Sequence, residues 1–500
     1  MTIPLPRKRT RPNPALSPAL VRASDLVHAP VVRQPANGDA WASGSDGKLR
    51  DPTSEAPTVN GSPLHPRLTV NYVSPDRLSP AARKLRVAGK RQQECLQRNI
   101  RRFGIVRPVL ARQQDGVVIA GHGILEAAKA VGVEQIPVTY VDHLSDDEIR
   151  ALRISLHRIE ELSSWDNDVL KVELEYLVDV DPDLLVFTGF DTAEIDVRLD
   201  DPKANADAAD DVPKIEGPTV SRTGDIWVFK GGHRLICGDA LSPAVFTALM
   251  ATETARLVLS DVPYNVPIAG HVSGRKGARE FAMASGEMTP AEFTRFLKAA
   301  FANAARVSVD GSLALYFIDW RHIEEMLAAG RGVYAALKNV IVWSKTNAGM
   351  GSLWRSQHEL IFAWKLGSVP HINHVVLGKN GRWRSNVWNY AGANAFGRTR
   401  DEELDGHVTP KSVAMLYDAI LDVTNRGDVV LDPFAGAGST LVAAHRARRV
   451  GYGIEIDPIY VDTAVRRLAK FTKAPARHAE TGKTFDEMMD ERHAAPAPSA

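Results

Sequence analysis

The stretch that most constrains the fold is "DVVLDPFAGAGSTLVAAHRARRVGYGIEID", residues 428–457. It reads as an apolar strand, a glycine-rich turn, a helix and a second apolar strand that ends in acids. Strands that alternate with helices pair in parallel, because a helix carries the chain back across the sheet between them. This unit therefore predicts two parallel strands, with the glycine turn at the carboxyl end of the first.

The same alternation runs through the chain from Gly224 onward. Short β-branched or aromatic runs are separated by segments with apolar residues at helical spacing, such as "PAEFTRFLKAAFANAARV". The predicted strands are "ARLVLS", "SLALYFI", "KNVIVW", "HELIFAW", "DVVLDPF" and "RVGYGIEI". This pattern predicts a doubly wound, Rossmann-like α/β domain over residues 219–474.

The rest of the chain divides into less regular parts. Residues 67–198 predict a small α+β domain with a helical tail, and the acidic, Ala- and Pro-rich segment 199–218 predicts a linker. We expect residues 1–66 and 475–500 to be disordered, because their polar composition cannot bury enough surface to offset chain entropy. A chain of 500 residues is in any case too long for one typical domain.

Bulk properties exclude several classes of protein. The net charge of +1 gives no information about partners, and no apolar run approaches the roughly 18 residues that span a bilayer. The N-terminus lacks the apolar core of a signal peptide, so we expect a cytoplasmic protein. Cys95 and Cys237 are too few for a disulfide framework or a cysteine metal site, and we expect no metal.

Three residues of the 428–457 unit suit a cofactor. Gly436 and Gly438 remove side chains where the backbone must approach a ligand, and Glu455 can accept hydrogen bonds from ribose hydroxyls. A nicotinamide fingerprint would need a third glycine that this turn lacks. A second candidate position is Asp261, which follows an apolar strand at the edge where open α/β sheets bind ligands.

The string "DPFAGAGST" resembles the S-adenosylmethionine loop of the amino-methyltransferases, with its pattern DPF-x-G-x-G-[ST]. The resemblance implies S-adenosylmethionine as the cofactor. The residues that it assigns to cofactor binding are Asp432, Phe434, Gly436, Gly438 and Ser439, with Glu455 on the ribose.

The string "SDVPYN" resembles the [DNS]-P-P-[YFW] motif of methyltransferases that modify exocyclic amines of DNA bases. The resemblance implies that Asp261, Val262, Pro263 and Tyr264 are catalytic. Asp261 and the carbonyl of Val262 would each accept one amine hydrogen and aim the nitrogen lone pair at the methyl group. Tyr264 would offer a flat face to the extruded base. Val262 stands where the family usually has proline, which leaves the carbonyl acceptor but a less stiff turn.

Further motifs place the resemblance in the β class, which has the catalytic motif before the cofactor motif. "HVTPKSV" (407–413) resembles the class element HP-T-x-KP, which implies cofactor roles for His407 and Lys411. "WSKTNAGMG…RSQHELIFAWK" (343–365) resembles its W-x-K…G…R-x-x-H-E stretch, and the resemblance covers roughly residues 220–472. In "HRLICGDA", Asp239 would lie near the adenine ring of the cofactor or, alternatively, cap the next helix.

The upstream string "FGIVRPVLARQQDGVVIAGHGILEAAKAVGVEQIPVTYV" resembles the ParB/sulfiredoxin-like domain of partition proteins. Ile124 stands where that family carries a phosphate-contacting arginine, which argues against nucleotide hydrolysis and favours a DNA-docking or regulatory role. His122 is structural or functional, and the structural interpretation is favoured. The basic run 83–102, with eight Lys and Arg against one acid, is either a solvated face or a phosphate contact.

Two segments near the catalytic motif are candidates for contacting double-stranded DNA. Residues 266–288 and 378–400 are rich in glycine and basic or aromatic side chains, and the alternative is that both are ordinary surface loops. The predicted DNA-binding residues are Arg275, Lys276, Arg279, Arg382 and Arg384.

The resemblances imply a site-specific DNA adenine-N6 methyltransferase with a ParB-like module, from a phage or another mobile element. Cytosine-N4 is the alternative target, although that group more often begins its motif with serine. Cytosine-C5 methylation is excluded, because neither cysteine has the required Pro-Cys setting. A partition-type clamp with a decayed catalytic half is a further alternative. A homodimer stays open, and no obligate endonuclease is inferred.

Overall fold

The computed structural model describes residues 58–59, 62–63, 68–83, 85–86, 88–199, 210, 212–213, 218–265, 286–346, 353–378, 382–390 and 411–494. The chain divides into two units, Met1–Thr69 and Val70–Ala500. In the first unit, strands β1 (Thr58–Val59) and β2 (Ser62–Pro63) pair antiparallel. Most of the segment 1–66 lies outside the described residues, so the expectation of disorder stays a prediction.

The upstream domain is α+β, as expected. Its sheet has the order β3-β6-β4-β5, in which only β4 and β6 are parallel. Its strands are β3 (Val70–Val73), β4 (Val109–Ala111), β5 (Val118–Ala120) and β6 (Ile136–Tyr140). Its helices are α1 (Lys90–Phe103), α2 (His122–Val131) and α3 (Asp146–Leu162), with a 3₁₀ turn, η2, at Pro75–Arg77. Leu125, Ala127 and Ala128 of α2 pack on the buried valines of β4 and β5.

A helical segment follows this domain and consists of α4 (Asn167–Val180), η3 (Pro182–Phe187) and α5 (Thr192–Leu199). Asp166 begins α4 because its side chain accepts from the amides of Asp168 and Val169, which otherwise have no partner within the helix. Asp181 begins η3 in the same way, accepting from Asp183. Leu170, Leu174 and Val178 of α4 share a small core with Leu185 and Ile195.

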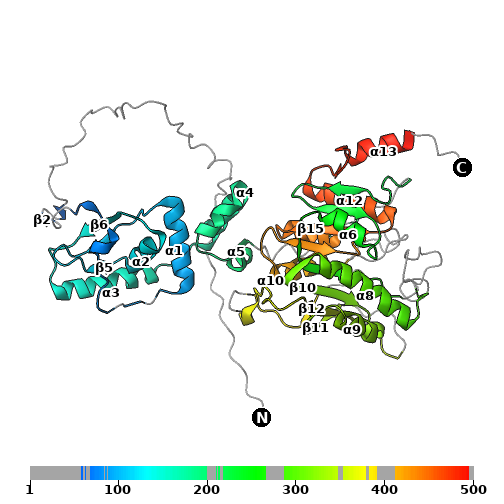
Figure 1. The fold of residues 1–500 in the computed structure, drawn as a ribbon, viewed down its shortest axis with the longest axis horizontal. Coiled ribbons are helices and arrows are strands. Elements are labelled where there is room, and N and C mark those ends of the chain that lie inside the picture. Colours follow the sequence, from blue (N-terminus) through cyan, green and yellow to red (C-terminus); the bar gives the residue numbers. More distant parts are fainter. Residues whose placement is uncertain are drawn as a thin grey trace, which may run out of the picture. The chain divides into compact units, whose positions relative to one another are not determined.

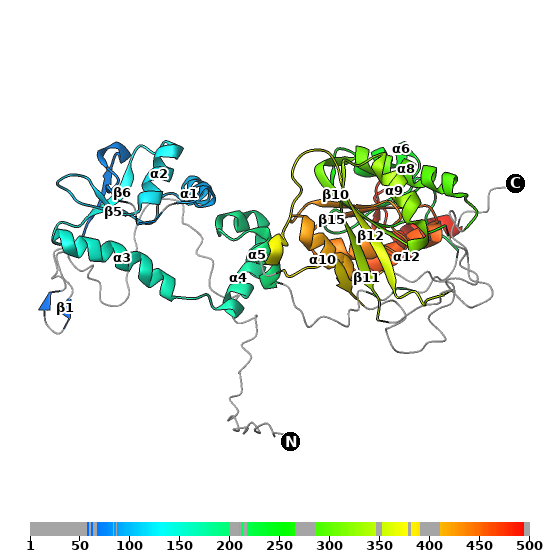
Figure 2. The ribbon, with the colours of Figure 1, turned by 90° about the horizontal axis from the view of Figure 1, so that it is seen from below.

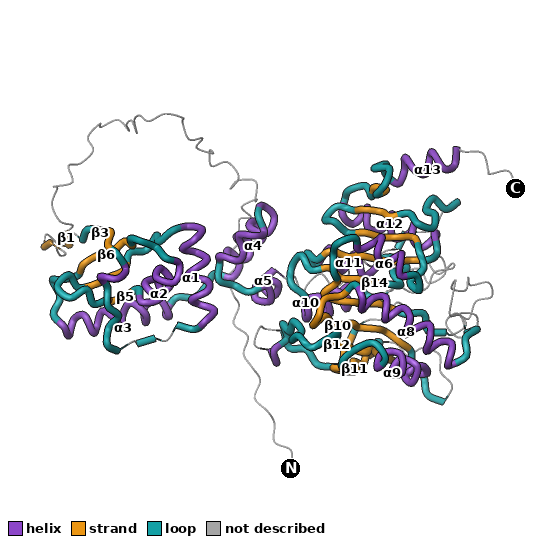
Figure 3. The backbone as a smooth tube through the Cα atoms, viewed as in Figure 1, coloured by secondary structure: helices purple, strands orange, loops and turns teal. Residues whose placement is uncertain are grey.

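The C-terminal domain contains a ten-stranded sheet with the order β13-β11-β12-β10-β9-β14-β15-β8-β7-β16 (Figure 3). The strands are β7 (Ile226–Val228), β8 (Arg234–Cys237), β9 (Ala255–Asp261), β10 (Ser308–Ile318), β11 (Ala336–Ser344), β12 (His358–Lys365), β13 (Val387–Asn389), β14 (Val429–Asp432), β15 (Val450–Glu455) and β16 (Arg477–His478). The central run from β10 to β8 is parallel, while β12, β7 and β16 pair antiparallel with their neighbours. This confirms the predicted doubly wound α/β class.

Helices cover both faces of this sheet (Figures 1 and 2). The helices on one face are α6 (Pro243–Met250), α8 (Pro290–Arg306) and α9 (Ile323–Arg331), whose apolar residues share a core with alternate residues of β9, β10 and β12. The helices on the other face are α10 (Val413–Val423), α11 (Ser439–Arg446), α12 (Pro458–Thr472) and α13 (Phe485–Ala494). Because both faces are covered, the central strands are mostly apolar.

The C-terminal tail differs from the expectation. Residues 477–494 are ordered: β16 extends the sheet beside β7, and α13 follows it. Phe485 lies against the buried Trp227 with ring centroids 5.2 Å apart. Arg492 also pairs with the Asp225 carboxylate. The tail is polar in overall composition, but it contains two apolar residues, Phe485 and Met488, that are buried. The prediction of disorder from residue 475 is therefore wrong up to residue 494.

The helical segment also contacts the C-terminal domain. Asp196 of α5 is only 4% exposed and accepts from Arg426 at 3.0 and 2.6 Å and from Arg449 at 2.9 Å. Within the predicted linker, the Asp210 side chain accepts from the amide of Val413, the first residue of α10, at 2.8 Å. The boundary between helical tail and catalytic domain is therefore bridged by specific contacts. Among the described residues, no helix is long and apolar enough to cross a membrane.

Candidate active site

The motif around Asp261 lies at the carboxyl edge of the sheet. Asp261 is the last residue of β9, and β9 pairs in parallel with β10 on one side and β14 on the other. Asp432 ends β14, so the two acids stand at the same edge on adjacent strands. This is the edge at which open α/β sheets bind ligands. The sequence-based placement of both motifs is confirmed.

The residues after Asp261 are held from several sides. Val262 is 2% exposed and packs in the core under α6 and α8. The hydroxyl of Tyr264 lies 2.8 Å from Asp261 Oδ1 and 2.8 Å from Glu359 Oε2. Asn265 has a φ of 51°, and its side chain bonds the backbone of Gly286 and Met288. The turn is thus fixed without the proline that the motif usually has at the position of Val262.

Two lysines and a second acid complete a charged cluster around Asp261. Lys411 Nζ lies 2.9 Å from Asp261 Oδ2, 2.8 Å from Glu359 Oε2 and 3.0 Å from the Tyr264 hydroxyl. Lys345 Nζ lies 2.5 Å from the other oxygen of Glu359. Glu359 is the second residue of β12 and Lys345 follows β11, so antiparallel pairing brings both to the same edge as Asp261.

Burial and charge act in opposite directions on the two acids. Burial raises the pKa of Asp261, and although Lys411 opposes this, Glu359 adds to it. Burial would also raise the pKa of Glu359, but the charges of Lys411 and Lys345 outweigh it and lower that pKa to about 2. The same neighbours raise the pKa of Lys411 to about 12 despite its burial. Glu359 and Lys411 are therefore a fixed ion pair, whereas Asp261 is the group that titrates more easily.

The predicted cofactor loop follows β14. Asp432 Oδ1 accepts from the Ser260 hydroxyl at 2.6 Å and from the Phe434 amide at 3.1 Å. Glu455, the last residue of β15, accepts from the Gly436 amide at 2.8 Å through one oxygen and from the Asp457 amide at 2.9 Å through the other. These bonds leave Glu455 lone pairs for further donors, since a carboxylate offers about four acceptor positions.

The two glycines of this loop differ in their surroundings. Both have positive φ, 49° at Gly436 and 77° at Gly438. A Cβ at Gly438 would lie 3.0 Å from the Ala464 side chain, so Gly438 lets α11 pack closely on α12. A Cβ at Gly436 would meet nothing within 4 Å. Gly436 therefore borders open space, as a backbone that approaches a ligand must.

The loop acids have raised pKa values. Burial raises the pKa of Asp432 to about 6, with hydrogen bonds from Ser260 and Thr440 opposing it. Burial raises the pKa of Glu455 to about 7, with backbone bonds opposing it. A buried acid near open space is typical of a ligand site, because a ligand's donors can stabilise the ionised form.

The remaining predicted cofactor residues have mixed outcomes. Ser439 begins α11, is buried, and accepts from Arg467 at 2.9 Å. Asp239 lies just beyond β8, which neighbours β15 at the same edge, and its side chain accepts from the Leu241 amide at 2.8 Å. His407 lies outside the described residues. The ammonium of Lys411 contacts Asp261, because residues 411–412 lead into α10 beside β9, and a cofactor role for Lys411 stays a prediction.

Two of the predicted DNA contacts lie in the described segment 382–390. Arg382 is 7% exposed and pairs with Asp418 and Asp422, and Arg384 pairs with Asp422 and with the Tyr390 hydroxyl. These ion pairs fix the 382–390 segment onto α10, and a DNA contact by either arginine stays a prediction. The other predicted contacts, Arg275, Lys276 and Arg279, lie outside the described residues.

Sequence reasoning did not select Glu359 and Lys345 as site residues. Both fall in the motif W-x-K…R-x-x-H-E, so a signal was present in the sequence. The motif places Glu359 and Lys345 near Asp261 only if β11 and β12 form a hairpin that returns to the edge at Asp261. The hairpin is present, and beyond its strands the Lys345 amide donates to the Gln357 carbonyl at 2.8 Å.

In the upstream domain, the structural interpretation of His122 fits the geometry. Its Nε2 accepts from the Ala81 amide at 3.3 Å, and Ile124 packs on the domain core. In the basic run, Arg91 pairs with Asp191 and Glu194, whereas Arg101 and Arg102 are exposed. A phosphate contact by this run stays a prediction.

A buried thiol and a cavity lie outside the cluster around Asp261. Burial raises the pKa of the Cys237 thiol to about 12, which makes it a poor nucleophile. No described group of three or more His, Cys, Asp or Glu could hold a metal ion.

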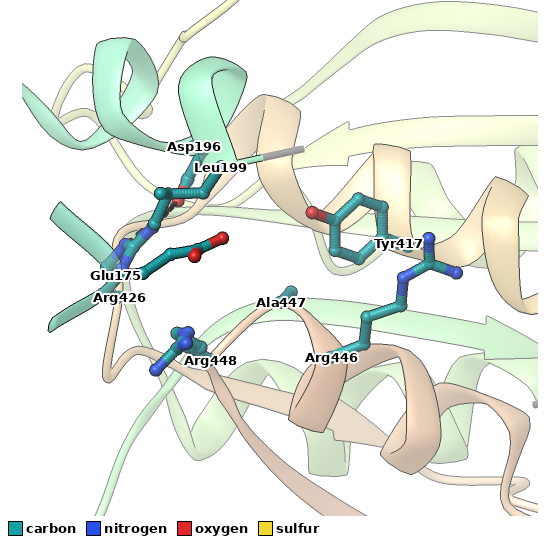
Figure 4. Close-up of a pocket in the computed structure, with 8 residues that line it drawn as sticks. All are labelled: Glu175, Asp196, Leu199, Tyr417, Arg426, Arg446, Ala447 and Arg448. Carbon is teal, nitrogen blue, oxygen red and sulfur yellow. Dashed lines mark hydrogen bonds and ion pairs between the residues drawn. The ribbon is translucent and has the colours of Figure 1, made fainter. Parts of the chain in front are cut away.

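A cavity of about 210 Å³ lies between α5 and the C-terminal domain, lined by Glu175, Asp196, Leu199, Tyr417, Arg426, Arg446, Ala447 and Arg448 (Figure 4). Its residues flank the amino ends of β14 and β15, at the opposite edge from Asp261.

Comparison with known proteins agrees with these motifs. Residues 255–466 match the DNA methylase family model of N6 and N4 methyltransferases. Residues 168–223 match the ParB-methyltransferase HTH domain, which covers α4, η3 and α5 and overlaps the predicted linker.

Two curated relatives show how similar the sequence is to individual proteins. The chain is 30% identical to the type II methyltransferase M.HinfI of Haemophilus influenzae, over 27% of this chain and 40% of that protein. It is 26% identical to the putative methylase YubD of Escherichia coli K12, over 50% of this chain and 97% of that protein. The chain spans half or less of the length of the first curated relatives that it matches.

A solved structure of a putative DNA modification methylase from Thermus thermophilus, complexed with S-adenosyl-L-methionine, is also similar. Its sequence identity is 21%, its TM-score is 0.34, and the match covers 48% of this chain and 94% of that one. The two family models and the motifs at the sheet edge agree. Residues 255–466 are therefore similar to the DNA methylase family of N6 and N4 methyltransferases, and residues 168–223 to the ParB-methyltransferase HTH domain.

Proposed function

We propose that this protein is a site-specific DNA methyltransferase that transfers a methyl group from S-adenosylmethionine to the N6 amine of adenine. The observation that carries the proposal is the pairing of β9 with β14. It sets the acceptor Asp261 beside the glycine loop and Glu455, so an amine and a cofactor can meet at one edge. When bound, S-adenosylmethionine supplies an electrophilic methyl group on its sulfonium.

The loop residues suit this cofactor. Gly436 borders open space and Glu455 keeps free acceptor positions, so we assign the ribose hydroxyls to Glu455. Asp239, Phe434 and Ser439 stand at the same edge and are assigned to the cofactor's surroundings. Phe434 lies 5.9 Å from the ring of Phe296, which anchors the turn on α8.

Asp261 and Val262 would accept the hydrogen atoms of the target amine. An adenine amine is a weak nucleophile because its lone pair is conjugated with the ring. Acceptance of its hydrogens by the Asp261 carboxylate and the Val262 carbonyl polarises the nitrogen and orients the lone pair. As the new N–C bond forms and the S–CH3 bond breaks, the sulfur leaves as the neutral thioether of S-adenosylhomocysteine and the nitrogen releases one proton, for which Asp261 is the adjacent base. Tyr264 remains our candidate for the face against the extruded base.

The alternative target is the N4 amine of cytosine. The same acceptors suit either amine, and the family model covers both chemistries. Asp at the first position of the motif favours adenine, since the cytosine-N4 group more often has serine there. The HTH segment and the upstream domain are proposed to dock double-stranded DNA, in keeping with the match over residues 168–223.

Expression in a host without DNA methylation tests the proposal. Nucleoside mass spectrometry of the host DNA should show N6-methyldeoxyadenosine, and modification-sensitive sequencing should place it at one recurrent site. N4-methyldeoxycytidine would establish the alternative. Unmodified DNA from cells that contain folded protein would argue for a DNA-binding protein without transfer activity.

A further inference from the structure

The cluster around Asp261 contains more charge than the proposed chemistry needs. The target amine requires one acceptor carboxylate, yet a second acid and two lysines surround it. The groups that face Asp261 are Lys411 ahead of α10, Glu359 on β12, Tyr264 on the catalytic turn and Asp432 on β14, with Lys345 behind Glu359.

The ammonium of Lys411 is confined. The side chain is 10% exposed, and Nζ lies 5.2 Å from the ring centre of Tyr264, 5.4 Å from that of Trp343 and 5.5 Å from that of Phe317. Aromatic rings at these distances attract a cation. Packed among three rings, the ammonium has little room to leave its place.

All three ammonium hydrogens have acceptors in this place. The acceptors are Asp261 Oδ2, Glu359 Oε2 and the Tyr264 oxygen. A lysine ammonium has three donors and no acceptor. Lys411 therefore has no donor left for a cofactor carboxylate while this arrangement holds.

Asp261 depends on this cation. Its side chain is 33% exposed, and both burial and Glu359 disfavour its ionised form. An ionised carboxylate only accepts hydrogen bonds and does so through both oxygens, whereas a protonated carboxyl turns one of its oxygens into a donor and keeps less acceptor capacity. One oxygen already takes the Tyr264 hydroxyl and the other takes Lys411, which together fix the plane of the carboxylate.

We propose that Lys411 is a positioning residue, held by Glu359 and the three rings so that it keeps the Asp261 carboxylate ionised and oriented toward the target amine. Lys345 supports the arrangement by neutralising the second oxygen of Glu359. Lys411 itself does not touch the substrate. The catalytic consequence rests on the proposed methyl transfer to an amine, whereas the control of Asp261 ionisation does not.

Two substitutions should move the titration of Asp261 in opposite directions. Lys411→Met removes a cation at nearly constant length, so the pKa of Asp261 should rise and the acid limb of kcat against pH should move to higher pH. Glu359→Gln removes a neighbouring negative charge while the amide oxygen of glutamine can still accept from Lys411 and keep it in place, so both should move to lower pH. A shift of about one pH unit in Lys411→Met would reduce the ionised fraction about tenfold in the acid limb. Lys338→Met, an exposed position on β11, is the matched control and should change neither.

The titration is read directly by carbon-13 NMR of aspartate carboxyls, with Asp261→Asn identifying the signal, and in parallel by methyl transfer to DNA. If the wild-type protein does not methylate DNA, the proposed function fails while the NMR titration still tests the inference. An equal Asp261 pKa in wild type and Lys411→Met, or shifts of the same sign in Lys411→Met and Glu359→Gln, would overturn it. Should Lys411→Met fail to fold by circular dichroism, a Glu359→Gln titration that is unchanged or moved to higher pH overturns it equally.

Discussion

Asp196→Ala should strongly destabilise the C-terminal domain, although Asp196 lies on α5, 230 residues before Arg426 and 253 before Arg449. The carboxylate accepts three hydrogen bonds from two arginines and is 4% exposed. One of these, Arg449, has a fully buried side chain. Removing the acid leaves a buried cation without its counter-charge.

The structure narrows the expected magnitude. Breaking a buried pair by removing one partner costs about 3–5 kcal/mol. Arg449 keeps other acceptors, namely the hydroxyl and carbonyl of Thr424 and the carbonyl of Ala447. Arg426 is 15% exposed and can reach water after a small movement. We therefore expect a loss near the lower end, about 3 kcal/mol.

Urea denaturation followed by circular dichroism measures this loss. The matched control is Asp179→Ala, which removes the exposed pair with Arg448, at 69% and 42% side-chain exposure, and should cost about 0–1 kcal/mol. Equal, small losses in the two variants would refute the docking of α5. A chain that begins at residue 219 lacks Asp196 and Asp210, so we expect it to be less stable than one that begins at residue 164.

Three further predictions concern the cofactor loop and the tail. S-adenosylmethionine affinity, measured by calorimetry, should fall as the pH is lowered from 8 to 6, because burial raises the pKa of Glu455 to about 7 and Glu455 binds ribose as the anion. In Glu455→Ala, the binding free energy at pH 8 should be weaker by about 1–3 kcal/mol, and the affinity should no longer depend on pH in this range. A flat wild-type profile would contradict the ribose assignment. Gly438→Ala should lower stability by about 1–2 kcal/mol, because φ is 77° and Cβ would press on Ala464; an unchanged melting temperature would count against this packing. Ending the chain at residue 484 should cost about 3 kcal/mol or more through lost burial of Phe485 and Met488, whereas ending it at residue 494 should cost nothing measurable by thermal unfolding.

The sequence predicted the parts of the site that follow one strand each. Asp261, Asp432 and Glu455 all end apolar strands, and parallel pairing necessarily brings such residues to one edge. The α/β class and the covered sheet followed from the same strand–helix alternation. Local patterns were sufficient here because each residue's position depends only on its own strand.

Residues whose roles depend on tertiary pairing were not predictable in this way. Glu359 and Lys345 reach Asp261 only because β11 and β12 form an antiparallel hairpin within an otherwise parallel region. Arg382 and Arg384 looked like surface cations, but Asp418 and Asp422 lie one turn apart on α10 and bury them. In the tail, two apolar residues were enough to order α13 against Trp227, which no local composition reveals.

The central claim is that Asp261 accepts the hydrogens of an adenine amine while the glycine loop holds the methyl donor. It is tested most directly by single-turnover transfer from radiolabelled S-adenosylmethionine to DNA carrying the mapped site, with wild type and Asp261→Ala compared at equal cofactor occupancy. The account predicts label on adenine N6 with wild type, and no transfer by the variant although calorimetry shows nearly unchanged cofactor affinity. Label on cytosine, transfer by Asp261→Ala at the wild-type rate, or loss of cofactor binding in that variant would contradict it.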